Sequence, residues 1–291
     1  MDISIRLDQQ GSVATADSIL RERYDHRSLI RKIVDFSISI FRQIGYSLTV
    51  FYHRLFLSNP QSCGQQIEWE SDSQGLVVLL HGLRNAPAAW YSQTGILQHH
   101  EKIDIFAPTV PKRGMCSLEE AATPILPTLL DYIQKNPGKP LCILGVSNGS
   151  RIATWLEIKL RDSASQTPVM VSTIAGVHLG SRRMNLLERL GLAKWFYPTA
   201  LREELTYGSD KARELLGQLS SPLPVGCAAR NYEFFASTED ISVPDLDSSL
   251  PTINKGEHSY IVHAHSHDSI VTAVAEQQIA SCVHWITRPH R

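Results

Sequence analysis

A serine that has a glycine two residues to either side is the strongest chemical signal in this sequence. Residues 141–146 form an apolar run that leads directly into Ser147, and Gly145 and Gly149 flank the serine. This spacing is typical of a nucleophile elbow, a strained turn from strand to helix that projects the serine hydroxyl above the edge of a sheet. Such a turn presses the two flanking positions together, so both must be small. We therefore predict that Ser147 is a nucleophile.

A serine nucleophile needs a base to take its proton and an acid to orient that base. Residues 234–236 end an apolar segment that we expect to be a strand, and Asp240 follows it closely. Asp240 is the expected acid. Its neighbour Glu239 should point away, and Asp245 and Asp247 lie farther along in a predicted surface loop.

The base must come from a group of four histidines near the C-terminus, at positions 258, 263, 265 and 267. His263 and His265 share one face of a predicted strand because side chains alternate along a strand. His267 falls in the loop after that strand, directly ahead of a predicted helix at residues 268–287. That loop can reach a serine at the carboxyl edge of the sheet. We predict His267 as the base and keep His265 as the second candidate.

The same histidines also suggest a different chemistry. The run His263-x-His265-x-His267-Asp268 superficially resembles the His-x-His-x-Asp-His motif of metallo-β-lactamase-like enzymes. The last two residues are in reversed order, and the run lies near the end of the chain with few further metal ligands after it. A metallohydrolase is therefore kept only as an alternative, and we expect no metal.

Two backbone N–H groups should stabilise the negative charge on the oxygen of the attacked carbonyl. Leu83 follows His81 and Gly82 at the end of an apolar run, where the glycine lets the chain curl so that the Leu83 N–H faces the serine. Asn148 offers the second N–H at the start of the helix that follows the serine, where the helix dipole favours negative charge. We expect His81 to hold the turn by hydrogen bonds rather than to transfer a proton.

The order of elements predicts an α/β fold. From residue 65 onward apolar strands alternate with amphipathic helices, which is typical of a mainly parallel sheet with helices on both faces. We expect Pro124 and Pro127 to bend one of these helices. The predicted strands are residues 65–70, 76–80, 103–110, 141–146, 169–177, 228–236 and 258–264, and the predicted helices are residues 88–99, 117–134, 151–160 and 268–287.

The chain order Ser147, Asp240, His267 resembles that of the α/β-hydrolase superfamily, over residues 65–286. The turn at His81-Gly82-Leu83 and the run Ser-His-Asp-Ser-Ile-Val that starts at Ser266 look like the lipase branch. Residues 205–215 are similar to a segment of class-2 lipases and of GPI inositol-deacylase-like proteins. The resemblance implies hydrolysis of carboxylic esters without a cofactor. Acyl transfer on the same scaffold, or a non-catalytic binding protein that keeps the hydrolase shell, are the alternatives.

Composition argues against several other classes of protein and site. The net charge is −1, so nothing indicates a nucleic-acid partner. The five cysteines are scattered without a Cys-x-x-Cys pair, which argues against a disulfide framework and against a zinc site. The sequence starts without the pattern of a secretory signal, and we expect a cytoplasmic protein, with peripheral membrane association as a further possibility.

One segment outside the core bears on the identity of the substrate. Residues 180–223 interrupt the fold where hydrolases carry a cap, and the apolar side chains Leu187, Leu190, Trp195 and Phe196 are candidates for the wall of an acyl pocket. The commoner form of the serine motif is Gly-His-Ser-x-Gly-Gly. Here Val146 stands in place of its histidine and Ser150 in place of its last glycine, so both residues bear on substrate specificity. We predict a small-molecule or lipid ester as the substrate.

The N-terminal region differs in character from the rest. We assign residues 1–60 to a basic, amphipathic helical extension and residues 61–291 to the catalytic domain, with the cap at about 180–223. Residues 21–54 carry seven Lys or Arg against three acids. The expected apolar face recurs at alternating steps of four and three and consists of Ile30, Val34, Ser37, Phe41, Ile44, Leu48, Phe51 and Leu55. We expect the apolar face to pack on the protein's own core. The alternative is that residues 20–57 lie on a lipid surface or against a partner.

Overall fold

The computed structural model describes residues 5–7, 28–56, 67–70, 72–253 and 256–290. Within these residues seven strands form one sheet in the order β1-β7-β6-β5-β4-β2-β3. The six strands β2 to β7 are parallel, and β1 pairs antiparallel with β7 at the edge. The strands are β1 (Ile5–Leu7), β2 (Gly75–Leu80), β3 (Ile103–Phe106), β4 (Leu141–Val146), β5 (Val169–Ile174), β6 (Arg230–Ser237) and β7 (Glu257–His263).

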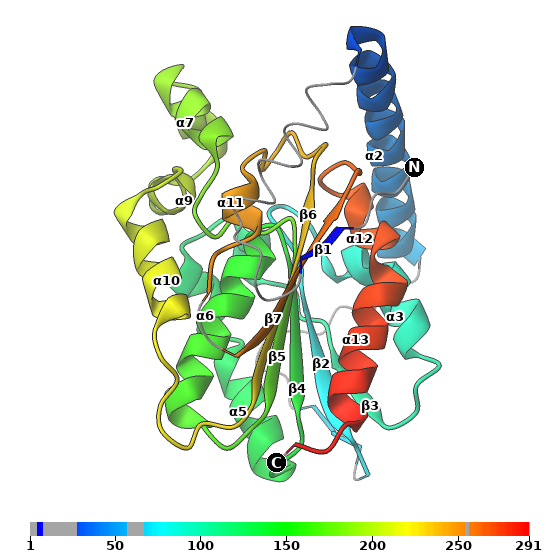
Figure 1. The fold of residues 1–291 in the computed structure, drawn as a ribbon, viewed down its shortest axis with the longest axis vertical. Helices are drawn as coiled ribbons and strands as arrows, with labels where there is room; N and C mark the ends of the chain where they lie inside the picture. Colours follow the sequence, from blue (N-terminus) through cyan, green and yellow to red (C-terminus); the bar gives the residue numbers. More distant parts are fainter. Residues whose placement is uncertain (1–4, 8–27, 57–66, 71, 254–255, 291) are drawn as a thin grey trace.

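Helices cover both faces of the sheet (Figure 1). Strands β2, β4 and β5 are buried along their whole length, as expected for a parallel sheet between two helical layers. The helices are α2 (Leu29–Phe56), η1 (Pro87–Trp90), α3 (Tyr91–Leu97), η2 (Pro111–Gly114), α4 (Leu118–Ala122), α5 (Leu126–Lys135), α6 (Asn148–Ser163), α7 (Arg182–Arg189), α8 (Ala193–Phe196), α9 (Thr199–Leu205), α10 (Asp210–Ser220), α11 (Leu246–Ser249), α12 (Ser269–Ala273) and α13 (Ala275–Thr287).

Each face of the sheet has its own apolar core. One core packs side chains of α4, α5, α6 and α10 against the sheet, and the other packs those of α2, η1, α3, α12 and α13. A third, smaller cluster joins α7, α8 and α9 to Val177 and Val243, which follow β5 and β6. The residues that follow the carboxyl ends of the strands therefore lie between the sheet and the segment of residues 182–220, which we call the α7–α10 segment.

Most predicted elements are present, but one expectation at the edge of the sheet is wrong. Residues 67–70, part of a predicted strand, belong to no strand. Trp69 there donates through Nε1 to Asp131, and the Glu70 N–H donates to the Asp104 side chain, so side chains take the place of a ladder. The antiparallel edge strand is β1, in which apolar and polar residues alternate but for which no strand was predicted.

Helix 117–134 is interrupted where Pro124 was expected to bend it. The first part, α4, ends at Ala122, and the second, α5, begins at Leu126 with Pro127 in its first turn. Proline is tolerated in a first turn because the N–H groups there have no partner inside the helix.

The long helix α2 is present, but its orientation is the reverse of the expectation. The helix packs on the body through Tyr46 and Val50, which are buried in the core on the η1 and α13 face. The predicted apolar face is instead exposed: Phe41 is 73% and Leu48 is 64% exposed. The same holds for Ile30, Val34, Ile44, Phe51 and Leu55, and we call these seven side chains the outer face of α2. The expectation that this face packs on the protein's own core is therefore wrong.

Candidate active site

Ser147 stands at a sharp turn between β4 and α6. Its backbone has a φ of 55° and a ψ of −122°, a conformation that costs a non-glycine residue about 1–3 kcal/mol. A Cβ at Gly145 would lie 2.4 Å from the Gly149 carbonyl oxygen, and a Cβ at Gly149 would lie 2.0 Å from that of Leu80. The predicted need for small residues on both sides of the serine is confirmed.

Ser150 replaces the last glycine of the commoner motif without disturbing the turn. Its Oγ donates to the carbonyl oxygen of Gly145 at 3.0 Å, and the side chain is fully buried. The hydroxyl therefore stabilises the elbow from inside.

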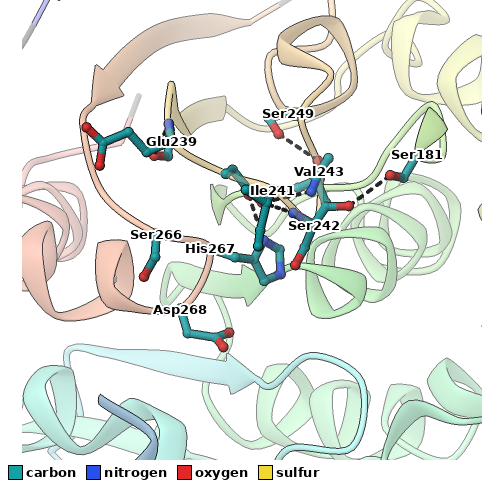
Figure 2. A network of polar contacts seen from close by, with 12 residues as sticks. Ser181, Glu239, Ile241, Ser242, Val243, Ser249, Ser266, His267 and Asp268 are labelled. Atoms are coloured by element: carbon teal, nitrogen blue, oxygen red, sulfur yellow. Dashed lines mark hydrogen bonds and ion pairs between the residues drawn. The ribbon is translucent and has the colours of Figure 1, made fainter. Parts of the chain in front are cut away.

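The carboxylate of Asp240 is held from two sides in the loop after β6. Its Oδ1 accepts hydrogen bonds from the backbone N–H groups of Ser242 and Val243, both at 2.7 Å. Its Oδ2 faces His267 and accepts a hydrogen bond from Nδ1 at 2.6 Å. Figure 2 shows the His267 ring beside the loop of residues 241–243, with Ser266 and Asp268 directed away from that loop. The two residues predicted as acid and base are thus in direct contact.

The environment of His267 favours the charged imidazolium. Burial by itself would lower the pKa of His267, but the nearby carboxylates of Asp240 and Asp268 outweigh burial and raise the pKa to about 9. Arg183, on α7, opposes this rise in pKa. The raised pKa means that the negative charge of Asp240 stabilises a proton on the ring, as a base that must hold a serine proton requires.

Ser147 and His267 line the same pocket, which has a volume of about 270 Å³. Leu83 and Val146 also line it, as two of the predicted residues near the serine. Asn148 is buried at the first position of α6, so its N–H belongs to the helix start that follows Ser147. A Cβ at Gly82 would lie 3.0 Å from the Ser147 Cβ, so the turn that carries Leu83 runs directly beside the serine.

His81 holds this turn, as predicted. Its Nε2 accepts a hydrogen bond from the Val110 N–H at 3.1 Å, which leaves the proton on Nδ1 to bond the Gly82 carbonyl oxygen at 2.8 Å. Burial lowers the pKa of His81 to about 4, so the ring is neutral at neutral pH. It does not line the pocket that contains Ser147.

Comparison with known proteins identifies the fold. No family model matches the chain. Lipase A of Sodiomyces alcalophilus is 27% identical over 194 residues, which cover 61% of this chain and 45% of that lipase. The chain therefore matches less than half the length of this relative. Among solved structures, the mature lipase BlEst2 of Bacillus licheniformis superposes with a TM-score of 0.53 over 79% of this chain and all of that one, at 14% identity.

A lipase-esterase related protein from Clostridium acetobutylicum gives a TM-score of 0.50, over 75% of this chain and 96% of that one, at 10% identity. These likenesses agree with the mainly parallel sheet covered by helices. The chain has an α/β-hydrolase fold. The predicted fold class is confirmed, whereas nothing in the comparisons distinguishes the class-2 lipase branch.

The α/β-hydrolase pocket is walled by the α7–α10 segment, but only partly by the residues predicted there. Leu187 lines the pocket. Leu190, Trp195 and Phe196 do not line it; their side chains lie on the surface, and Trp195 is 75% exposed. The correct wall residues were missed because a cluster of apolar residues in sequence does not indicate which side of a short helix faces inward. Apolar wall residues from this segment and from the strand ends are Val177, Met184, Tyr197, Leu205 and Val243.

The alternative metal site does not form in this α/β-hydrolase fold. Among the described residues no group of three or more His, Cys, Asp or Glu side chains is placed to hold a metal ion. The rings of His263 and His265 are 6.4 Å apart between centroids, and His267 bonds Asp240 instead of joining them. The geometry therefore gives no support to a metallohydrolase.

Proposed function

We propose that this protein is a serine hydrolase that cleaves carboxylic esters. The observation that carries the proposal is that Ser147, on its elbow, lines the same pocket as His267, whose Nδ1 bonds the buried carboxylate of Asp240. Nucleophile, base and orienting acid are the three groups that this chemistry needs.

In the proposed reaction Ser147 Oγ attacks the ester carbonyl while His267 Nε2 takes its proton. Asp240 stabilises the imidazolium that results, and the N–H groups of Leu83 and Asn148 hold the oxyanion. The imidazolium then gives its proton to the leaving alcohol. Water, deprotonated by the same histidine, hydrolyses the acyl-enzyme and restores the serine.

An apolar acyl or lipid ester is the substrate class that the site favours. About half of the residues that line the pocket are apolar, with Leu83, Val146, Val177, Met184 and Leu187 among them, and the others are polar or charged. We infer that the α7–α10 segment is a cap over the serine, within a catalytic domain of residues 61–291. The names of the lipases to which the chain is similar support this substrate class.

The proposal is tested with Ser147→Ala in a short-chain nitrophenyl ester assay. The variant should lose turnover by about 10³-fold or more because the nucleophile is absent, and its circular dichroism and melting temperature should match those of the wild type. A fluorophosphonate probe should label the wild type and not the variant. Undiminished turnover, or equal labelling of both proteins, would refute the triad.

We further propose that the outer face of α2 binds an anionic lipid surface. The helix is 28 residues long, and none of the described helices is both long and apolar enough to cross a bilayer. A helix with an apolar face and basic residues is suited to lie in the membrane interface. α2 carries Arg31, Lys32, Arg42 and Arg54 against a single acid, Asp35.

The position of α2 fits a lipid surface better than an unrelated partner. A second group of exposed apolar side chains lies on and beside α7 and α8: Leu186, Leu190, Leu192, Trp195 and Phe196. Figure 1 shows α7 and the N-terminal half of α2 rising at the same end of the molecule, beyond the loops that follow the strands. The pocket is lined by residues that follow the carboxyl ends of the strands, at this same end, so contact of both groups with a lipid layer would bring the pocket close to its ester substrates.

Vesicle binding tests this second proposal. Replacing Ile30, Val34 and Phe41, on the N-terminal half of α2, together by Gln should abolish sedimentation with phosphatidylglycerol-containing vesicles. It should not lower the melting temperature, because all three side chains are exposed. Val225→Gln is the matched control, since Val225 is exposed and lies in the loop between α10 and β6. If the triple variant sediments with vesicles as the wild type does, or if the wild type elutes as a dimer that the variant cannot form, the lipid proposal is wrong.

A further inference from the structure

One side chain of α2 reaches the loop that carries the proposed base. Gln43 donates from Nε2 to the carboxylate of Asp268. Its Oε1 accepts from Ser266 Oγ at 2.9 Å and from the Asp268 N–H at 3.3 Å. A single amide therefore spans the two residues on either side of His267, across 225 positions of sequence.

We propose that Gln43 is a positioning residue for His267, and that α2 is part of the frame of the active site rather than an appendage to it. The proposal rests on the proposed function, since it assigns Gln43 a role only if His267 is the base. It adds a means of regulation, because the way in which α2 packs on the body then controls the position of the His267 ring.

The loop of residues 264–268, which we call the histidine loop, is held from two sides. On one side Ser237, at the end of β6, donates through Oγ to the His265 carbonyl oxygen and accepts from the His265 N–H at 3.1 Å. On the other side α2 bonds it through Gln43 and through Arg42, whose Nη1 donates to the Ala264 carbonyl oxygen at 3.2 Å. The β6 contact fixes the start of the loop, and Gln43 fixes the part around His267.

A neutral amide side chain of the length of glutamine can make all three hydrogen bonds found at position 43. The carboxylate of Asp268 needs a donor, whereas Ser266 Oγ and the Asp268 N–H need an acceptor, and a glutamine supplies both from one side chain. Leucine supplies neither. Glutamate keeps the acceptor but loses the donor and adds a negative charge.

The charges that face His267 make this difference measurable. Asp240 comes from the loop after β6, Asp268 from the histidine loop itself and Arg183 from α7, while Gln43 on α2 contributes no charge. Gln43→Glu adds a third carboxylate near the imidazole, which raises the pKa of His267 further. The base must be neutral to accept a proton, so the acid limb of the pH profile moves to higher pH. Loss of folded protein alone would reduce the rate without moving this limb.

The matched control is another polar contact of the same helix with the body. Tyr46 Oη donates to the Ala89 carbonyl oxygen at 3.1 Å, at η1 rather than to a residue of the histidine loop. Tyr46→Phe removes that hydrogen bond and keeps the ring in the core. It therefore weakens the attachment of α2 to the body without changing the hydrogen-bond partners of Ser266 or Asp268.

The experiment compares full-length wild type, Gln43→Leu, Gln43→Glu, Tyr46→Phe and Ser147→Ala with a soluble nitrophenyl ester, over pH and with thermal unfolding in parallel. Gln43→Leu should lower kcat on the order of ten-fold with little change in KM, since displacing a reacting group by a fraction of an ångström has such an effect. Gln43→Glu should move the acid limb up by about half a pH unit or more. Tyr46→Phe should leave both kcat and the acid limb unchanged.

The outcomes separate the two proposals. If both Gln43 variants keep the kcat and the pH profile of the wild type while Ser147→Ala is inactive, the positioning role is wrong and the hydrolase proposal stands. If Ser147→Ala remains active, the hydrolase proposal itself fails. If Tyr46→Phe lowers kcat as much as Gln43→Leu and Gln43→Glu leaves the acid limb unmoved, Gln43 contributes only to the stability of α2.

Discussion

The carboxylates around His267 determine the pH range in which it can act as a base. Burial disfavours the charged ring, but Asp240 and Asp268 outweigh it and raise the pKa of His267 to about 9. A protonated imidazole cannot accept the serine proton, so the active form accumulates only as the pH rises toward that pKa.

We therefore expect kcat/KM for a neutral ester to rise about ten-fold per pH unit below the pKa and to level off near pH 9. Initial rates at low substrate concentration between pH 5 and about 10, in buffers of constant ionic strength, measure this. Asp240→Asn should move the remaining activity to lower pH, because it removes the largest charge that favours the proton. An acid limb at the ordinary histidine value of 6.5 in the wild type would contradict the proposed coupling.

At the scale of elements, a buried ion pair connects the α7–α10 segment to the helix that starts at Ser147. Glu204, on α9, accepts a hydrogen bond from Arg151 Nη2 at 3.1 Å and one from the Leu118 N–H at 2.9 Å. Arg151, on α6, is 1% exposed and also donates to the Asn148 side chain at 3.1 Å. The α7–α10 segment, which forms part of the pocket wall, and α6 are therefore joined through the carboxylate of Glu204.

Glu204→Ala should lower the free energy of unfolding by about 3–5 kcal/mol, because it leaves the Arg151 cation buried without its partner. Urea denaturation followed by circular dichroism measures the change. The neighbouring residue provides the control: Glu203 pairs with Lys211 at the surface, and Glu203→Ala should cost no more than about 1 kcal/mol. Equal losses for the two variants would show that the buried pair does not stabilise the fold in this way.

At the scale of the whole molecule, charge is distributed unevenly. The chain has a net charge of −1, yet α2 carries four basic residues and one acid. The proposed attraction to an anionic lipid surface is therefore local to α2, and salt would screen it over about 10 Å at 0.1 M.

We expect binding to anionic vesicles to weaken markedly between about 0.05 and 0.5 M NaCl, as the electrostatic part is screened. Binding to neutral vesicles should be weaker and nearly independent of salt, because only the outer face of α2 drives it. Sedimentation of the full-length protein with both vesicle types measures this. Salt-independent binding to anionic vesicles would mean that the basic residues contribute nothing.

The sequence predicted the parts of the site that depend on local structure. The elbow is specified within about ten residues, since an apolar strand, two glycines and a helix leave the chain one way to turn at Ser147. The hydrogen bond of His81 to the Gly82 carbonyl oxygen was predictable for the same reason, because it stabilises a turn beside the residue itself. The pairing of Asp240 with His267 followed from the order of strands, although their roles stay predictions.

Tertiary packing alone decided the rest. The amphipathic pattern of α2 specifies a helix, but an apolar face is satisfied equally by a protein core or by lipid, so the pattern could not indicate which side packs through Tyr46. Nor could it indicate that Gln43 meets Ser266 and Asp268, because contacts between residues more than 200 positions apart depend on how complete elements pack. Local backbone preferences act over a few residues. The pocket wall and the packing of α2 on the body depend instead on surfaces that exist only once the chain has folded.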